Sequence, residues 1–413
     1  MTKSELISVC ESARGTLPMI AQNDVREKIL LSLSAAISEN KDDILKSNAA
    51  DIASARRSGT SGAMLDRLLL TPERIDAMAS SVKSVCALPD PTGLEEENSR
   101  PVGIIICKYR VPIGVVAMIY EARPNVTVDA AALCLRSGNS VILRGGHEAL
   151  NTNIALVRII RGVLSRFGAE NAVTLIEDTD RENVNLLLSL RGYVDLAIPR
   201  GGAGLIRSVV ENARVPVIET GAGNCHIYVH ESADIPMAVK ITVNAKAQRP
   251  SVCNAAETLL CDEKIAAEFL PAAAKALSDA GVEIRADSRA RKYIPSAHEA
   301  TEEDFFREYN DYIIAVGIVD GVEDAVNHIN RFGTKHSDAI IARDPAAVEY
   351  FFTHTDSAVL YHNASTRFTD GGEFGMGAEI GISTQKLHAR GPFALEALTT
   401  IQYRVSGNGQ IRN

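Results

Sequence analysis

The sequence lacks any apolar run long enough to cross a membrane, and it contains no low-complexity segment. Its first residues also lack the positively charged start and the apolar stretch of a secretory signal peptide. These absences argue against a membrane protein and against a secreted one. We therefore expect a protein of the cytoplasm.

Cysteine is sparse and irregularly spaced. None of the seven cysteines forms a Cys-x-x-Cys pair, and their odd number leaves no complete set of disulfides. We therefore expect neither a disulfide framework nor a zinc site, and no metal is predicted. Reduced thiols in a cytosolic chain are the natural interpretation.

Positive charge is also in deficit. The chain has 43 Lys and Arg against 52 Asp and Glu, and its formal net charge is −9. An acidic protein has no overall electrostatic attraction to nucleic acid or to an anionic membrane, so neither is expected as a partner. Any anionic ligand must then be held by a local group of basic residues.

The 413 residues exceed what one hydrophobic core usually supports, so more than one domain is expected. Residues 1 to about 90 place apolar side chains at helical spacing. From about residue 100, short apolar segments typical of strands alternate with segments typical of helices. This order predicts a parallel, doubly wound α/β sheet with ligands bound at the strand ends.

The expected strands of this first α/β series include Val215–Glu219 and His226–His230. A second α/β series begins with an expected helix at Ile235–Gln248. The tail, Ala397–Val405, is rich in β-forming residues and has no partner nearby in the sequence. Such a strand often pairs with a distant hairpin or with another subunit.

Cys253 is the cysteine with the most informative surroundings. The helix before it is expected to end near Gln248, because Pro250 cannot continue a helix and restricts Arg249. Cys253 then lies in a loop, with Lys246 and Arg249 close enough in sequence to lower the pKa of its thiol. On spacing alone, a small buried apolar cysteine is the commoner case, and the other six cysteines fit it.

Two glycine-rich turns follow expected strands, in Val141–His147 and in Ala197–Leu205. A glycine turn that opens a helix presents backbone N–H groups to a phosphate. Neither turn contains the Gly-x-Gly-x-x-Gly fingerprint, and a tight strand–helix connection accounts for each equally well. Glu219 precedes a third small-residue turn, where a base, a cofactor contact and a structural carboxylate all remain open.

The order of these motifs resembles the aldehyde dehydrogenase superfamily over nearly the whole chain. The residues that carry the resemblance are Val111–Val116, Gly138–Arg144, the glycine turns, Glu219 and Cys253. Four further segments are similar to the reductases of that superfamily that act on gamma-glutamyl phosphate. They are Ile119–Thr127, Arg249–Asn254, Gly333–Ile340 and Phe374–Thr384.

The resemblance implies an aldehyde dehydrogenase-like α/β fold with two Rossmann-like domains and a small β oligomerisation element. The NADP-binding domain is expected over 1–100 and 114–230, with part of 365–395. The catalytic domain, which carries Cys253, is expected over 231–364. The β element is expected over 101–113 and 396–413, and it predicts a homo-oligomer.

The resemblance also implies a reaction. An enzyme of this kind reduces L-glutamate 5-phosphate (gamma-glutamyl phosphate) to L-glutamate 5-semialdehyde with NADPH, in proline biosynthesis. Cys253 is the expected nucleophile, which forms a thioester as phosphate leaves. The backbone N–H of Cys253 and the side chain of Asn125 are the expected oxyanion donors. A transient contact with glutamate 5-kinase, which makes this unstable substrate, is a further expectation.

Two other functions are compatible with the sequence. A hydrolytic aldehyde dehydrogenase would use Glu219 as a base and would need no phosphate. A non-catalytic protein that kept the fold would tolerate replacement of Cys253.

The same resemblance, with the chemistry of the substrate, gives two sets of candidate residues. Those expected to bind the cofactor are Arg144, Gly145, Gly146, Gly201, Gly202, Gly204, Glu219 and Glu308. Those expected to hold the phosphate and the α-carboxylate of the substrate are Arg123, Lys246, Arg249, His336 and Arg367. NADP is favoured over NAD mainly by the resemblance, and also because Arg144 could pair with a 2′-phosphate.

Overall fold

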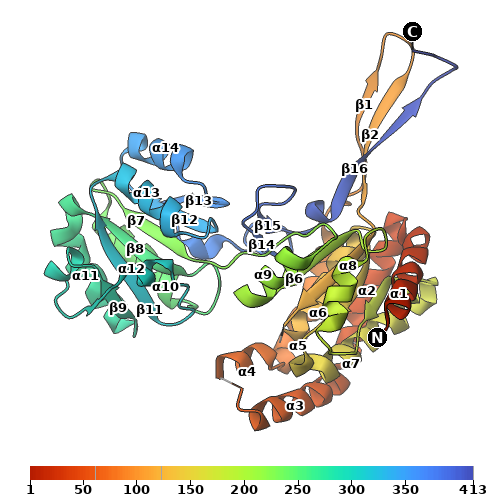
Figure 1. Ribbon diagram of the computed structural model, residues 1–413, viewed down its shortest axis with the longest axis horizontal. Coiled ribbons are helices and arrows are strands. Elements are labelled where there is room, and N and C mark those ends of the chain that lie inside the picture. The colour runs from red at the N-terminus through yellow and green to blue at the C-terminus, as the bar shows by residue number, and fades with distance from the viewer. Residues whose placement is uncertain (61, 122, 413) are drawn as a thin grey trace. The chain divides into compact units, whose positions relative to one another are not determined.

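The computed structural model describes residues 1–60, 62–121 and 123–412, and the chain divides into two compact units (Figure 1). The first unit comprises Met1–Thr220, Gly375–Gly381 and Phe393–Asn413. The second comprises Gly221–Phe374 and Ile382–Pro392. Among the described residues, no helix is both long and apolar enough to cross a membrane.

A four-stranded parallel sheet of order β5-β4-β3-β6 forms the centre of the first unit. Its strands are β3 (Val115–Tyr120), β4 (Ser140–Arg144), β5 (Val173–Leu175) and β6 (Leu196–Arg200). Every residue of β3 is buried, as expected for a parallel strand covered on both faces. Because β3 pairs with both β4 and β6, the carboxyl ends of these strands lie at one edge of the sheet.

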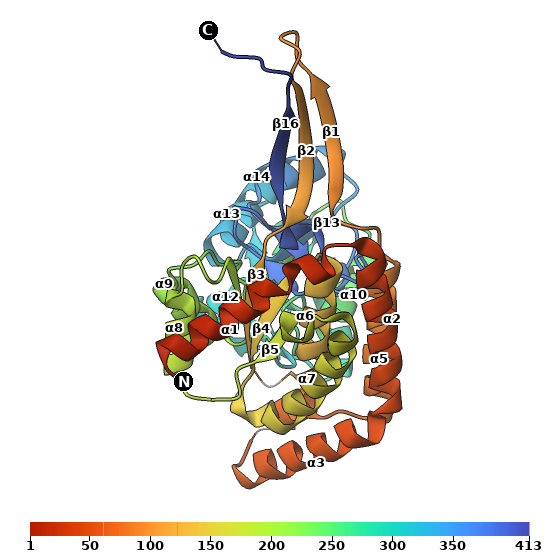
Figure 2. The same cartoon turned by 90° about the vertical axis from the view of Figure 1, so that its right-hand side faces the viewer.

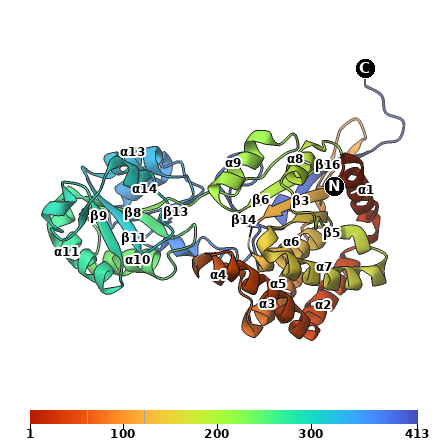
Figure 3. The same ribbon diagram turned by 60° about the horizontal axis from the view of Figure 1, so that its bottom comes forward.

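Helices cover both faces of this sheet (Figure 3). The connecting helices are α6 (Pro124–Arg136), α7 (Leu150–Leu164), α8 (Glu182–Ser189) and α9 (Ala203–Asn212). The helical prediction for the first 90 residues or so is confirmed by α1 (Lys3–Gly15), α2 (Asn23–Glu39), α3 (Lys41–Arg57), α4 (Gly62–Leu68) and α5 (Pro72–Ala87). On one face, Leu6 and Cys10 of α1 pack with Val115 and Ala117 of β3 in one buried cluster.

A three-stranded antiparallel arm projects from the first unit (Figures 1 and 2). It consists of β1 (Gly93–Ser99), β2 (Ile105–Pro112) and β16 (Thr399–Ser406), in the order β1-β2-β16. The β element predicted from the sequence omits β1 and assigns it to the cofactor domain. The seven residues of β1 are all exposed, and Glu95 pairs with Lys108 and Arg110 of β2. A strand held by cross-strand ion pairs shows no apolar alternation, so sequence periodicity does not reveal it.

The second unit is built on a seven-stranded parallel sheet of order β10-β9-β11-β8-β7-β12-β13. In chain order its strands are β7 (Cys225–Val229), β8 (Ala256–Asp262), β9 (Glu283–Ala286), β10 (His298–Glu299), β11 (Ile313–Val319), β12 (Ser337–Ile341) and β13 (Val359–His362). Two short strands, β14 (Gly381–Ser383) and β15 (Gly391–Phe393), pair with each other.

Two helical layers enclose the seven-stranded sheet (Figure 3). On one face, α10 (Ile235–Ala247) and α11 (Glu263–Asp279) pack into the largest buried cluster of this unit. On the other face, α13 (Val322–Phe332) and α14 (Pro345–His354) pack against Tyr228 and Leu260. The short helix α12 (Glu302–Phe306) precedes β11.

Three predicted boundaries need correction. The strand expected at His226–His230 is β7, and it pairs with β8 and β12, so the first unit ends at Thr220 and not at residue 230. Within 365–395, only 375–381 and 393–395 belong to the first unit. Val215–Glu219 forms a single bridge, between Val217 and Ala197, because Pro216 has no N–H to extend a ladder. A fully buried strand such as β7 carries no sequence mark of the sheet it joins.

Candidate active site

Cys253 lies in the loop between α10 and β8 of the second unit. The helix α10 ends at Ala247 and is capped by Gln248, so the helix end predicted from Pro250 is confirmed. Cys253 is half-buried, whereas Cys10, Cys86, Cys134, Cys225 and Cys261 are buried. Burial raises the pKa of Cys10 to about 11 and also raises the pKa values of Cys134 and Cys261. These thiols remain protonated at neutral pH, which leaves Cys253 as the accessible thiol of the second unit.

The turn before β7 fixes the backbone of Cys253. A Cβ atom on Gly223 would lie 1.5 Å from the Cys253 carbonyl oxygen and 2.6 Å from its Cα. The Cys225 thiol donates a hydrogen bond of 3.2 Å to the same carbonyl oxygen. The small-residue turn found in the sequence therefore serves as a backbone contact for the nucleophile loop, and only glycine fits at position 223.

Arg367, a predicted substrate residue, contacts residues on both sides of Cys253 in the sequence. Its Nε donates to Gln248 Oε1 at 2.9 Å, and its Nη1 donates to Asn254 Oδ1. Burial and the nearby Arg249 cation lower the Arg367 pKa, while Asp370 and the Cys253 and Cys225 thiols oppose that shift. The charge of Arg367 is therefore coupled to that of Arg249 and to that of Cys253. A cation coupled to a thiol favours its thiolate, and a guanidinium can also hold a substrate anion.

Lys246 does not join this group. Its Nζ lies 2.6 Å from Glu257 Oε2, and both side chains are completely buried. Burial lowers the Lys246 pKa and raises the Glu257 pKa, and each shift is opposed by the other member of the pair. A cation enclosed with its counter-ion cannot also hold a substrate anion, so the predicted substrate contact of Lys246 does not fit this geometry.

Glu308 contacts the same turn that supports Cys253. Its Oε1 accepts a hydrogen bond of 2.8 Å from the backbone N–H of Gly223. The neighbouring Asn310 donates its N–H to Glu257 Oε1 at 3.2 Å and has a positive φ of 56°. The buried Lys246–Glu257 pair thus helps to hold the loop that presents Glu308.

His336 is fully buried and lies immediately before β12. Its Nδ1 lies 3.6 Å from the Cys225 sulfur and 2.9 Å from Ser337 Oγ. This position supports Cys225 and does not resemble an exposed anion ligand. Glu219 is half-buried in the first unit, just after the bridge at Val217.

The two predicted glycine turns lie at the carboxyl edge of the first unit's sheet, after β4 and β6. A Cβ on Gly145 would lie 2.3 Å from Asn153 Nδ2, and a Cβ on Gly201 would lie 2.6 Å from Glu121 Oε2. Gly146 precedes a 3-10 helix. Gly204 lies in the first turn of α9, where a Cβ atom would meet nothing within 4 Å. Paired turns at this edge are where α/β sheets bind dinucleotides, so their placement fits such a cofactor.

Two contacts limit what this edge can bind. The Gly202 N–H, at the start of α9, donates to Glu121 Oε2 at 2.7 Å, so this amide already has an anionic partner. Arg144 is buried, and its guanidinium donates to the carbonyls of Gly145 at 2.6 Å and Thr179 at 2.5 Å. Burial lowers the Arg144 pKa. A guanidinium committed to carbonyls does not fit the predicted pairing of Arg144 with a 2′-phosphate.

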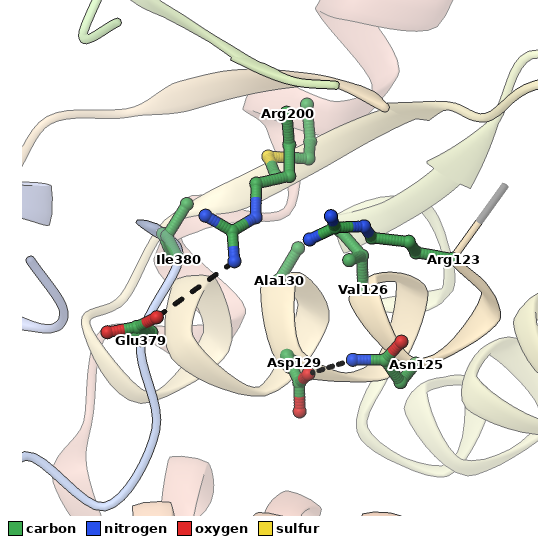
Figure 4. A pocket seen from close by; sticks show the side chains of 9 residues that line it. Arg123, Asn125, Val126, Asp129, Ala130, Arg200, Glu379 and Ile380 are labelled. Atoms are coloured by element: carbon green, nitrogen blue, oxygen red, sulfur yellow. Dashed lines mark hydrogen bonds and ion pairs between the residues drawn. The ribbon is translucent and has the colours of Figure 1, made fainter. Parts of the chain in front are cut away.

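A small hollow opens beside these turns, within the first unit (Figure 4). Arg123 and Asn125 line it from the start of α6, as predicted substrate and catalytic residues. Asn125 Nδ2 donates to Asp129 Oδ2 at 3.1 Å, and burial raises the Asp129 pKa to about 6. The sequence prediction missed three of its charged residues, namely Asp129, Arg200 and Glu379. Arg200 immediately precedes Gly201 of a predicted glycine turn, and Glu379 lies in a segment that carries the family resemblance. Either position could therefore have marked these residues as site candidates.

Among the described residues, no cluster of His, Cys, Asp and Glu side chains is arranged to hold a metal ion. The site residues therefore form three groups. The Cys253 loop, with Arg249, Arg367 and Glu308, belongs to the second unit. The glycine turns and the hollow both belong to the first unit.

Comparison with known proteins gives consistent matches along the chain. A sequence profile of the aldehyde dehydrogenase family matches residues 1–309. The gamma-glutamyl phosphate reductase of Moorella thermoacetica is 56% identical over 389 residues, which cover 94% of this chain and 93% of that protein. The reductase of the same name from Carboxydothermus hydrogenoformans is 52% identical over 412 residues, covering 99% of each chain.

Solved structures agree. The crystal structure of gamma-glutamyl phosphate reductase from Thermotoga maritima is similar with a TM-score of 0.96 and 45% identity, covering 99% of this chain and 100% of that one. A probable aldehyde dehydrogenase from Listeria monocytogenes has a TM-score of 0.72 at 14% identity, covering 100% of this chain and 99% of that one, which indicates a shared fold alone.

Proposed function

The chain belongs to the aldehyde dehydrogenase family and, within it, to the gamma-glutamyl phosphate reductases, and on this premise we propose its reaction. The family resemblance and the fold class predicted from the sequence are both confirmed. We propose that the protein reduces L-glutamate 5-phosphate to L-glutamate 5-semialdehyde in proline biosynthesis, uses NADPH and releases inorganic phosphate.

The observation that carries this proposal is the half-buried Cys253 thiol, whose backbone is fixed by Gly223 and whose charge is coupled to that of Arg367. The thiolate attacks the acyl carbon, a C–S bond forms, and the C–O bond to phosphate breaks. The leaving phosphate takes the electron pair, so the product of this step is a thioester and inorganic phosphate. Arg249 and Arg367 are proposed to stabilise the thiolate and the negative charge of the phosphate.

The oxyanion that forms during attack needs hydrogen-bond donors fixed in advance. The backbone N–H of Cys253 is one proposed donor, because Gly223 and Cys225 hold this segment of backbone in place. The Asn125 amide is the second proposed donor. Its bond to Asp129 orients the side chain and uses only one of its two N–H hydrogens.

When bound, the nicotinamide cofactor supplies the hydride that reduces the acyl group to an aldehyde. The turns containing Gly145, Gly146, Gly201, Gly202 and Gly204 are proposed to contact it, with Glu219 and Glu308 as further contacts. The preference for NADP rests on family membership, because Arg144 is engaged by carbonyl groups. No role as a base is proposed for Glu219.

The arm offers a surface for self-association. In the described part of the chain, β1 and β16 are both edge strands, and Tyr403 and Val405 of β16 are 65% and 59% exposed. An exposed edge with apolar side chains favours pairing with another copy, so we propose a homo-oligomer built through the arm. Sedimentation of wild type and a chain truncated before β16 tests this, and an unchanged mass would exclude the arm. Contact with glutamate 5-kinase stays a prediction.

The central experiment is phosphate-dependent reduction of NADP⁺ by glutamate 5-semialdehyde. Wild type should be active only with phosphate, and Cys253→Ala should lose essentially all activity while still binding the cofactor. Cys107→Ala is the matched control, because Cys107 is the other cysteine that is not buried. Equal activity without phosphate would instead favour the hydrolytic aldehyde dehydrogenase.

A further inference from the structure

The hollow of the first unit presents charged groups of both signs to one small space. Figure 4 shows the Arg123 guanidinium pointing toward Arg200, while the Arg200 guanidinium points toward the Glu379 carboxylate. Arg200 Nη2 and Glu379 Oε1 are 3.9 Å apart, which is too far for a hydrogen bond. Their side chains are only 19% and 17% exposed. A cation and a carboxylate therefore face the same small space without a direct hydrogen bond between them.

The backbone is shaped to bring Glu379 to Arg200. A Cβ on Gly381 would lie 2.9 Å from Arg200 Nη1 and 2.4 Å from Thr220 Cγ2, so only glycine lets this segment pack so closely. Between Glu379 and Gly381, the Ile380 N–H donates to the Phe393 carbonyl at 3.0 Å and anchors the segment. Arg200 itself is the last residue of β6, which pairs in register with β3.

Asp129 has a different role in the hollow. Its two carboxylate oxygens accept from Asn125 at 3.1 Å and from Ser81 at 3.4 Å. Hydrogen bonds to both oxygens make Asp129 a support for Asn125. Glu379 is the carboxylate that lies beside Arg200 in this hollow.

We infer that this hollow recognises the α-amino acid end of the substrate: Arg200, with Arg123, binds the α-carboxylate, and Glu379 binds the α-ammonium group. The inference rests on the proposed function, because it assumes a glutamyl substrate. A phosphate dianion would gain from the arginines but would be repelled by Glu379 and Asp129. An α-amino acid carries one group of each sign on a single carbon, which matches the two signs present here.

The test compares two aldehydes that differ only at the amino acid end. Glutamate 5-semialdehyde carries both α groups, whereas 5-oxopentanoate has the same chain and carboxylate without the amine. Arg200→Gln should raise KM for both aldehydes about tenfold or more, with kcat changed by less than about threefold. Glu379→Gln should raise KM for glutamate 5-semialdehyde alone. A structural role would not distinguish the two aldehydes.

Arg161→Gln provides the matched control, because it removes an arginine that pairs with Glu170 on the surface of the same unit. Its kinetic constants should equal those of wild type. Calorimetric titration with L-glutamate gives a readout that needs no turnover. Wild type and Arg161→Gln should bind it, and Arg200→Gln and Glu379→Gln should bind it about tenfold more weakly or worse.

The outcomes separate this inference from the proposed function. If wild type shows phosphate-dependent turnover but both variants keep wild-type KM values and L-glutamate binding, the inference is wrong and the reaction stands. If Arg200→Gln raises KM for inorganic phosphate and leaves L-glutamate binding unchanged, the hollow holds phosphate and the inference is also wrong. If wild type lacks phosphate-dependent turnover, the proposed reaction fails, and the titration alone decides whether the hollow binds an amino acid.

Discussion

Gly223 lies so close to Cys253 that a methyl group on it would meet the Cys253 carbonyl oxygen at 1.5 Å. The same glycine donates its N–H to Glu308. One residue without a side chain therefore joins the nucleophile loop to a proposed cofactor contact, and the two cannot be adjusted independently.

Gly223→Ala should reduce both stability and activity. The clash is with backbone atoms, so relief requires a shift of the Cys253 loop, and overpacking of this kind costs about 1–3 kcal/mol. We expect a lower melting temperature and a fall in kcat, both measured on the purified protein. Gly162→Ala is the control, since a Cβ there meets nothing within 4 Å on helix α7. Wild-type values for Gly223→Ala would contradict the backbone contact.

Arg367→Gln should slow alkylation of Cys253. Loss of a nearby cation disfavours the thiolate, and we expect the rate with iodoacetamide at pH 7 to fall about three- to tenfold. The modified residue is identified by mass spectrometry, and Cys10, with a pKa of about 11, should remain unlabelled. Lys275→Gln, a charge loss on an exposed pair with Asp279, should leave the rate unchanged. An unaltered rate in Arg367→Gln would exclude this electrostatic link.

Lys246→Met should be strongly destabilising. It leaves Glu257 buried without its counter-ion, and loss of one member of a buried pair costs about 3–5 kcal/mol. The double variant Lys246→Met/Glu257→Gln should recover most of this loss, because the amide that replaces the Glu257 carboxylate is neutral and can still accept from the Asn310 N–H. Urea denaturation of wild type and both variants measures the coupling. Equal losses in single and double variants would show that the ion pair is not the cause.

Asp129 should make stability depend on pH. Its folded pKa of about 6 lies above the ordinary value of 3.8, so the folded protein binds this proton more tightly than the unfolded chain. The resulting stabilisation is complete below about pH 4 and is lost as the pH rises through 6. Asp129→Asn should therefore be more stable than wild type at pH 8 by roughly 3 kcal/mol and nearly equal to it at pH 4. Denaturation at both pH values checks the sign, and a variant that is weaker at pH 8 would refute it.

The sequence predicted the α/β order because buried parallel strands leave long apolar runs, as in β3. It failed where other forces hold an element. Glu95 and its basic partners stabilise β1 through charge, and the sheet that β7 joins depends on long-range pairing with β12. Neither effect leaves a local pattern in the chain.

The candidate site shows the same division. Cys253 and the arginines near it are proposed because the order of motifs around them resembles the aldehyde dehydrogenase superfamily, whereas spacing alone does not single out this cysteine. The engagement of Lys246 by Glu257, and of Arg144 by the carbonyls of Gly145 and Thr179, depends on folding and could not be predicted. The sequence identifies a basic residue that could bind an anion, but the folded structure determines which group it contacts.

The arm also has a consequence for synthesis. Pro112 of β2 pairs with Thr399 of β16, and Asn139 donates to the Leu398 carbonyl at 2.8 Å. During translation, β2 therefore stays unpaired with β16 until the whole second unit has emerged from the ribosome. At about 5–20 residues per second this interval lasts on the order of tens of seconds. An unpaired strand edge can associate with other chains, so we expect the nascent protein to need a chaperone during this interval.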